Sequence, residues 1–265
     1  MLHRLLSTIF VLLLASFCRA GEGKTVWVEG GDYRLKTNVF QSKTIGKKPV
    51  LLVVIHGDSP FDKPEYQDFF AQQVAHKSDN LVAVGLLRPG YTDPQGNVSE
   101  GERGLSNGDN YNARNTDAIA ASIRELKKRY QSGKVVVAGH SGGAAITANI
   151  LSRHGDLIDD ALLVSCPCDV NAWRSGMLQL TGYPVFKGEI DTLSPIEQVA
   201  KLSDHTNITM IVGSRDKVAP PELSEGYRAA ASKAGKEIRL VRLEKGEHDI
   251  FLEPEVIAEL TSMLK

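Results

Sequence analysis

Cysteine is scarce in this chain of 265 residues, which contains three. Only Cys166 and Cys168 lie beyond the first twenty residues, and they are spaced as Cys-Pro-Cys. A bridge between them would close a very tight ring, which Pro167 restricts further. No other cysteine or histidine is close enough in sequence to complete a metal site with them. We therefore expect two structural or incidental thiols, with a disulfide as the alternative.

The chain also lacks a surplus of positive charge and the motifs that hold common cofactors. Its 31 Lys and Arg residues are balanced by 32 Asp and Glu residues, and the two signs are interspersed. A surface for nucleic acid is therefore not expected. We find no phosphate loop, no dinucleotide fingerprint and no residues with metal-ligand spacing in the sequence. We expect no cofactor, no metal ion and no nucleic-acid partner, and a small-molecule ester or short peptide as the substrate.

Long apolar runs are absent except at the N-terminus. Residues 1–4 provide a basic start, residues 5–17 are almost wholly apolar, and residues 18–20 (Cys-Arg-Ala) place small residues at a cleavage site. This pattern indicates a secretory signal peptide at 1–20 followed by a single domain at 21–265. A membrane anchor is disfavoured because the run is shorter than the roughly 20 residues that span a bilayer. A lipoprotein signal is the other alternative. We expect a secreted or periplasmic protein without a stable membrane span after cleavage.

The rest of the chain alternates short apolar runs with segments of helical period. Strands are predicted at 50–55, 81–87, 134–138, 160–165, 207–212 and 238–243. Helices are predicted at 65–77, 113–130, 142–154, 220–234 and 254–264. Nearly continuous apolar strands are typical of a parallel sheet that helices cover on both faces. We therefore expect an α/β fold with a mainly parallel central sheet, preceded by an antiparallel hairpin at 25–40.

Two segments do not fit this alternation. Residues 92–112 form a long stretch rich in Gly, Asn and Asp, and loops of such length are usually functional or mobile. Residues 169–200 contain several large apolar side chains and are predicted to form a small cap over a pocket. Trp173 in this insertion is a candidate substrate contact.

The stretch VVVAGHSGGAAI at 135–146 contains a Gly-x-Ser-x-Gly motif centred on Ser141. The motif follows a buried strand and opens a helix, which is the context that a nucleophile elbow requires. Gly139 and Gly143 supply the space that such a tight turn needs. The amide of Gly142, at the start of the helix, is a candidate donor to an oxyanion.

A serine nucleophile needs a base and an acid that orients the base. His248 is the candidate base because it follows the last predicted strand. Asp216 is the candidate acid because it follows the preceding one, and Asp169 is the alternative acid. His140, beside the nucleophile, is expected to point elsewhere, and His56 ends a strand.

The chain order Ser141, Asp216, His248 resembles that of the α/β-hydrolase superfamily, and the resemblance covers nearly all of residues 25–265. The stretches IHGDSP, RPGY and GHSGGA are similar to those of small secreted or periplasmic members allied to prolyl-oligopeptidase-like and dienelactone-hydrolase-like esterases. The resemblance implies an α/β-hydrolase fold with a small cap insertion and a Ser-His-Asp triad.

The resemblance also implies a second oxyanion donor just after His56 and Gly57. We assign it to the backbone amide of Asp58. Arg88 and Tyr91 follow the strand at 81–87, at the sheet edge where ligands bind in such folds. Both are candidate substrate contacts, although Arg88 could instead brace its loop.

These observations predict a serine hydrolase that cleaves carboxylic esters through an acyl-enzyme. A serine peptidase acting on short peptides is the first alternative. A binding protein that retains the fold without catalysis is the second.

Overall fold

The structure, a computed structural model, describes residues 23–265, so the expected signal peptide lies outside the described residues. The strands are β1 (Lys24–Gly30), β2 (Tyr33–Gln41), β3 (Val50–Ile55), β4 (Leu81–Leu86), β5 (Lys134–His140), β6 (Asp160–Val164), β7 (Asn207–Gly213) and β8 (Arg239–Leu243). The α-helices are α1 (Tyr66–Lys77), α2 (Ala113–Arg129), α3 (Gly142–Arg153), α4 (Val170–Thr181), α5 (Pro221–Lys233) and α6 (Pro254–Met263). Short 3-10 helices form at η1 (Asp109–Tyr111), η2 (Pro184–Phe186) and η3 (Pro195–Lys201).

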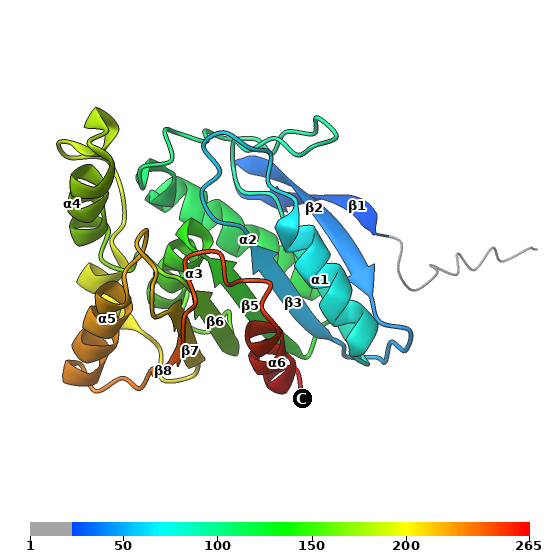
Figure 1. The fold of residues 1–265 in the computed structure, drawn as a ribbon. Coiled ribbons are helices and arrows are strands. Elements are labelled where there is room, and N and C mark those ends of the chain that lie inside the picture. The colour runs from blue at the N-terminus through cyan, green and yellow to red at the C-terminus, as the bar shows by residue number, and fades with distance from the viewer. Residues whose placement is uncertain (1–22) are drawn as a thin grey trace, which may run out of the picture.

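The strands form one sheet in the order β1-β2-β4-β3-β5-β6-β7-β8 (Figure 1). Strand β1 pairs antiparallel with β2, and β2 pairs antiparallel with β4. All the remaining pairs are parallel. The expected hairpin is therefore present, and its second strand joins it to the parallel part of the sheet.

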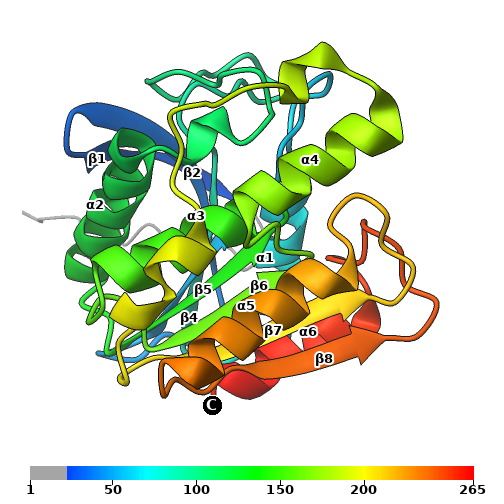
Figure 2. The same cartoon turned by 90° about the vertical axis from the view of Figure 1, so that its left-hand side faces the viewer.

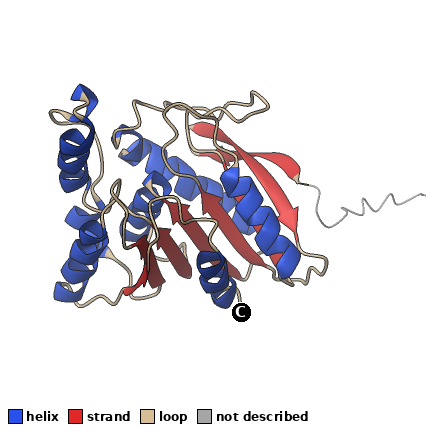
Figure 3. Cartoon of the chain, in the orientation of Figure 1, coloured by secondary structure: helices blue, strands red, loops and turns tan. Residues whose placement is uncertain are grey.

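The two faces of the sheet carry separate apolar cores because side chains alternate along each strand. In β3, Leu51, Val53 and Ile55 belong to one core, and Leu52 and Val54 belong to the other. Helices α2, α3 and α5 cover the first face, and α1 and α6 cover the second (Figures 1 and 2). Figure 3 shows the strands lying between the two helical layers. The predicted mainly parallel α/β sheet is confirmed.

The predicted strands and helices agree with the observed bounds to within one or two residues. The largest extension is in β5, which continues from the predicted 134–138 to His140. Between residues 23 and 265, none of the helices combines the length and the apolar content needed to cross a bilayer.

The loop at 92–112 is held by hydrogen bonds from buried polar side chains. Thr92 and Val98 form an isolated antiparallel bridge. The Ser99 hydroxyl donates to the carbonyl of Leu87 at 2.7 Å. The Asn110 amide donates to backbone carbonyls of neighbouring loop segments. This loop is thereby tied to the segment that follows β4.

The insertion at 169–200 contains α4, η2 and η3, and α4 projects above α3 at one end of the molecule (Figure 2). Arg174 in α4 is buried, and its guanidinium donates to the carbonyl of Asn107 at 2.6 Å. It also donates to carbonyls in the segment around η2. Arg174 therefore clamps the insertion to the end of the long loop, while a capping role stays a prediction.

The expectation of two free thiols is wrong, because Cys166 and Cys168 form a disulfide. Residues two apart in a strand have Cα atoms about 6.6 Å apart, whereas these two are 5.2 Å apart. The chain has already left β6 at this point, and Ser165 takes a left-handed conformation with φ of 51°. The separation of the two Cα atoms is set by the backbone of Pro167 between them, and 5.2 Å lies within the range of a disulfide. The tight ring that argued against a bridge from the sequence is therefore closed.

Candidate active site

Ser141 lies between the end of β5 and the start of α3, in a strained backbone conformation with φ of 52° and ψ of −120°. A Cβ atom at Gly139 would lie 2.5 Å from the carbonyl oxygen of Gly143. A Cβ atom at Gly143 would lie 2.3 Å from the carbonyl oxygen of Ile55. Both glycines are therefore required for the sharp turn that presents the serine.

The three predicted catalytic side chains form one hydrogen-bonded line. His248 Nε2 lies 3.0 Å from Ser141 Oγ. His248 Nδ1 lies 2.9 Å from Asp216 Oδ2 and 3.1 Å from Oδ1. The Asp216 carboxylate is fully buried, and the His248 side chain is 16% exposed. A proton can therefore pass between Ser141 and His248 while Asp216 orients the ring.

The backbone around Asp216 fixes its carboxylate. Oδ1 accepts hydrogen bonds from the amides of Val218 at 2.9 Å and Ala219 at 2.8 Å. The alternative acid, Asp169, instead caps α4 by accepting from the amide of Ala172 at 3.0 Å. The structure thus brings Asp216, and not Asp169, to the histidine.

The candidate oxyanion donors are the amides of Gly142 and Asp58. Gly142 is the first residue of α3, where a backbone amide has no partner within its own helix. The segment before Asp58 lies against the nucleophile, because a Cβ atom at Gly57 would be 2.9 Å from Ser141 Cβ. The carbonyl of Gly57 accepts from His56 Nδ1 at 2.7 Å. Since a trans peptide places its C=O and N–H on opposite sides, this bond directs the Asp58 amide away from the His56 ring.

The protonation of His56 follows from its partners. The backbone amide of Arg88 donates to His56 Nε2 at 3.0 Å, so the ring proton must be on Nδ1. His56 is fully buried. Burial and the nearby Arg88 charge hold the pKa of His56 well below its ordinary value. The ring therefore stays neutral and keeps its bond to the Gly57 carbonyl.

The side chain of Asp58 packs next to the Gly142 Cα, where a Cβ atom would lie 2.7 Å from its Oδ1. A bare carboxylate there would repel a developing oxyanion. Arg88 Nη1 contacts Asp58 Oδ1 at 3.0 Å, and the Tyr111 hydroxyl donates to Oδ2 at 2.6 Å. Burial raises the pKa of Tyr111, and the Asp58 charge raises it further, so this phenol remains a donor. Arg88 compensates the carboxylate.

The structure places Arg88 and Tyr91 inside the protein and not on the surface of a pocket. Arg88 is fully buried, and its Nη2 donates to Asn110 Oδ1 at 2.6 Å. Tyr91 is 1% exposed, and its hydroxyl reaches Asp58 at 3.3 Å. These contacts favour the bracing role for Arg88 and give Tyr91 a similar one.

Trp173 in α4 packs against Tyr111 of η1 and Phe186 of η2. Its ring centroid lies 6.4 Å from that of Tyr111 and 5.6 Å from that of Phe186. The indole is 6% exposed, and its N–H is buried without a partner among the described residues. Trp173 is therefore placed in the wall between the insertion and η1.

Four residues near the site were not predicted from the sequence to act there. They are Tyr66, Asn110, Tyr111 and His140, and each bonds to a group described above or to the His248 segment. No local motif marks the first three, because their contacts come from segments far apart in sequence. His140 directly precedes Ser141, and its ring turns away from the serine toward Tyr66 and the His248 main chain.

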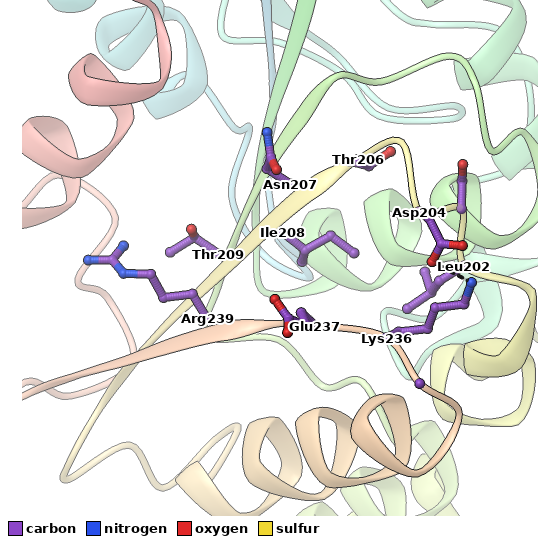
Figure 4. Close-up of a pocket in the computed structure, with 11 residues that line it drawn as sticks. Leu202, Asp204, Thr206, Asn207, Ile208, Thr209, Lys236, Glu237 and Arg239 are labelled. Carbon is purple, nitrogen blue, oxygen red and sulfur yellow. Dashed lines mark hydrogen bonds and ion pairs between the residues drawn. The ribbon is translucent and has the colours of Figure 1, made fainter.

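Two cavities differ in their relation to these residues. One, of about 570 Å³, is lined by His248 and by charged residues that include Glu247, Asp249 and Lys245. The other, of about 430 Å³, lies at the amino ends of β7 and β8 and is bordered by the Lys236–Asp204 ion pair (Figure 4). Only the first adjoins the hydrogen-bonded line.

Among residues 23–265, no three His, Cys, Asp or Glu side chains are arranged to hold a metal ion. The expectation that the reaction needs no metal or cofactor stays a prediction.

Comparison with solved structures places this architecture among α/β-hydrolases. Acylaminoacyl peptidase of Pyrococcus horikoshii matches with a TM-score of 0.67 and 17% identity, over 90% of this chain and 40% of that chain. A puromycin-hydrolysing peptidase of Mycobacterium tuberculosis matches with a TM-score of 0.70 and 17% identity, over 92% of this chain and 38% of that chain. The chain therefore spans about two fifths of the length of these peptidases. At such identities the likeness shows the fold alone.

A third similar structure is the esterase Est1E of Butyrivibrio proteoclasticus, solved with bound ferulic acid. It matches with a TM-score of 0.66 and 16% identity, over 91% of this chain and 96% of that chain. No curated protein matches the chain significantly. In sequence, residues 92–264, which are more than half of the chain, match the prolyl oligopeptidase family (Peptidase_S9). The protein therefore belongs to the prolyl oligopeptidase family of serine hydrolases, within the α/β-hydrolase superfamily.

Proposed function

We propose that this serine hydrolase cleaves carboxylic esters through an acyl-enzyme in a secreted or periplasmic setting. The observation that carries the proposal is the line from Ser141 Oγ through His248 to Asp216, with distances of 3.0 Å and 2.9 Å. This line stands beside the amides of Gly142 and Asp58 at a nucleophile elbow. Nucleophile, base, orienting acid and oxyanion donors are the groups that acyl transfer requires.

The reaction follows from this geometry. His248 Nε2 accepts the Ser141 proton while Oγ attacks the ester carbonyl, and the resulting oxyanion accepts from the amides of Gly142 and Asp58. Asp216 holds the imidazolium through Nδ1–H. His248 then donates the proton to the leaving alcohol, which leaves an acyl-serine. A water molecule attacks this ester while His248 takes its proton. The second intermediate then collapses, His248 returns the proton to Ser141 Oγ, and the carboxylic acid is released.

Two observations support an ester over a peptide. The Asp58 carboxylate is engaged by Arg88 and Tyr111, so it is not free to bind a peptide amino terminus. In addition, the similar structures that the alignment covers almost completely are named esterases: Est1E at 96% and an esterase of Pyrococcus furiosus at 89% of their chains. The peptidase alternative is supported by the family match and by the named peptidases.

The test compares wild-type protein with Ser141→Ala on short-chain nitrophenyl esters and on aminoacyl nitroanilides. We expect ester hydrolysis with a higher kcat/KM than anilide hydrolysis, and a loss in kcat of about 10⁴ to 10⁶ in the variant. A fluorophosphonate probe should label the wild type at Ser141 and leave the variant unlabelled. Higher kcat/KM on anilides would favour the peptidase, and an unlabelled, inactive wild type would favour the non-catalytic alternative.

The compartment is tested separately. The disulfide between Cys166 and Cys168 supports an oxidising compartment, as the apolar start of the sequence does. N-terminal sequencing of protein recovered from medium or periplasm should find a chain that begins at residue 21. Recovery of the uncleaved chain from the cytoplasm alone would contradict the proposal.

A further inference from the structure

Two polar side chains that the triad does not use lie between its loops. Tyr66 is the first residue of α1, and His140 is the last residue of β5, directly before Ser141. The two rings meet edge to face, with centroids 5.5 Å apart. The His140 ring also lies 5.3 Å from the ring of His248.

These side chains form a continuous hydrogen-bonded relay. The amide of Gly57 donates to the Tyr66 hydroxyl at 2.5 Å. The hydroxyl lies 2.9 Å from His140 Nδ1, and His140 Nε2 lies 3.2 Å from the carbonyl oxygen of His248. The relay therefore connects the loop after β3, which holds the oxyanion donor Asp58, with the loop after β8, which holds the base.

The direction of every bond in the relay is determined by its ends. The Gly57 amide can only donate, and the His248 carbonyl can only accept. A neutral His140 ring must therefore carry its proton on Nε2, and the Tyr66 hydroxyl must donate to the bare Nδ1. For a neutral ring, no other arrangement of the protons satisfies all three bonds.

Both side chains stay neutral, as this arrangement requires. Burial, followed by the nearby His248, lowers the pKa of His140 to about 4. Burial raises the pKa of the Tyr66 phenol well above its ordinary value. At neutral pH the Tyr66 hydroxyl therefore keeps its proton and donates a hydrogen bond to His140 Nδ1.

We propose that Tyr66 and His140 are positioning residues for ester hydrolysis, which fix the spacing between the Asp58 amide and the His248 imidazole around Ser141. This inference rests on the proposed function. Tyr66 holds the backbone next to one oxyanion donor. His140 holds the backbone of His248, which is the base.

The two residues are not expected to contribute equally. The amide of Ile250 and the hydroxyl of Ser165 also donate to the His248 carbonyl, so His140 provides one of three donors there. Tyr66, as the acceptor of the Gly57 amide, should therefore matter more.

The first experiment is Tyr66→Phe, which retains the ring packing and removes the hydroxyl. We expect kcat to fall about 10- to 100-fold with KM changed by less than about twofold, because small displacements of reacting groups mainly affect the transition state. An aryl trifluoromethyl ketone, whose serine adduct carries an oxyanion, should bind weaker by the same factor as the loss in kcat/KM. All rates are expressed per active site titrated with a fluorophosphonate.

The second experiment separates the two ends of the His140 ring. Asn at 140 can accept from Tyr66 where Nδ1 stood but cannot reach the His248 carbonyl. Gln at 140 places an amide N–H near the position of Nε2 and can restore that bond. We expect His140→Asn to lower kcat by about tenfold and His140→Gln to recover most of it. Equal activity in the two variants would contradict the role given to His140.

The matched control is Tyr227→Phe, because the buried Tyr227 hydroxyl in α5 has no partner among the described residues. It should leave kcat and ketone binding unchanged. Tyr66→Phe with native kcat per titrated site would overturn the proposal, whether or not its Tm falls. A wild type without ester hydrolysis or fluorophosphonate labelling would instead remove the proposed function itself, so the two failures are distinguishable.

Discussion

Two buried ionic clusters in this protein use the same residue types with opposite results. At the elbow, Asp58 faces one cation, Arg88, at 3.0 Å. Between β2 and α1, the buried Lys36 faces two carboxylates, Asp93 at 2.9 Å and Asp68 at 3.8 Å. Both oxygens of Asp58 have partners, whereas Asp68 Oδ1 is buried without one.

The difference shows what keeps a buried carboxylate ionised. The elbow supplies one cation for one carboxylate, together with phenol donors. The cluster under α1 supplies one cation for two carboxylates, and burial raises the pKa of Asp68 to about 6 in spite of Lys36. Asp58 is compensated by a fixed charge of its own, whereas Asp68 shares the single cation Lys36 with Asp93 and takes up a proton at a higher pH than usual. The Lys36–Asp93 pair is also held in place, so the two clusters differ at Asp68.

The largest effect is expected at Asp216, which like Asp58 has partners on both oxygens. Asp216→Asn should lower kcat by about 10⁴, because the amide would favour the wrong tautomer of His248. Its Oδ1 can still accept from the backbone amides, so the fold should remain. Steady-state ester hydrolysis measures the loss. Asp169→Asn is the matched control, since Asn is as good an N-cap as Asp. A decrease in kcat of less than tenfold in Asp216→Asn would contradict the role of Asp216 in orienting His248.

Arg88→Met should have the next largest effect, on stability. It leaves the Asp58 carboxylate without its cation, and breaking a buried pair in this way costs about 3–5 kcal/mol in the free energy of unfolding. Urea denaturation followed by tryptophan fluorescence measures it. Lys236→Met is the control, because its partner Asp204 is 82% exposed and such pairs contribute about 1 kcal/mol or less. Equal losses in the free energy of unfolding of the two variants would contradict the view that the buried Arg88–Asp58 pair contributes more than the exposed Lys236–Asp204 pair.

The pH dependence of stability should have opposite signs at His140, which lies beside the elbow, and at Asp68 in the cluster under α1. His140 has a folded pKa of about 4 against about 6.5 when unfolded, so the unfolded state binds more protons between these values. Its contribution to the free energy of unfolding is fully present above pH 6.5 and is lost as the pH falls toward 4. Asp68 has a folded pKa of about 6 against an ordinary 3.8. The native state binds the extra proton there, so this contribution grows as the pH falls through the same window.

Urea unfolding between pH 4.5 and 7 tests these signs. His140→Gln should make the increase of stability with pH less steep, by up to about 1.4 kcal/mol per pH unit. Asp68→Asn should make it steeper by a similar amount. His140 faces the ring of His248 and the carboxylates of Asp216 and Asp249, which remain in both variants. Changes of the same sign in the two variants would contradict the comparison.

The smallest effect is expected for Asp68→Asn at pH 7.5. Asparagine keeps the shape, can accept the hydrogen bond that the Asn38 amide gives to Asp68 Oδ2 at 2.7 Å, and carries no charge to bury. The free energy of unfolding should stay within about 1 kcal/mol of the wild type. A larger loss, measured by the same urea titration, would mean that the Lys36 attraction outweighs the burial of the ion.

The sequence predicted the parts of the protein whose signals are local. The strands of the parallel sheet are apolar throughout because both faces are buried, and the elbow glycines around Ser141 are required by the turn itself. The line from Ser141 to His248 and Asp216 could be anticipated because parallel strands end at one edge of the sheet.

The remaining features depend on contacts between distant segments. Tyr66 approaches His140 only after α1 has packed on the sheet, and no spacing in the sequence encodes this. The roles left open for Arg88 could not be separated without knowing that Asn110 and Asp58 enclose it. The disulfide was not predicted because the Cys-Pro-Cys spacing alone does not show how the backbone of Pro167 places the two Cα atoms 5.2 Å apart.

The backbone at Ser141 has a consequence for how this protein can evolve. Its φ of 52° and ψ of −120° suit glycine better than serine. A serine persists there through the demand of the reaction, since the fold alone would favour its loss. Ser141→Gly should therefore yield an inactive chain that melts at a higher temperature than the active one. If so, a relative that no longer needs catalysis could become more stable by replacing the nucleophilic serine with glycine.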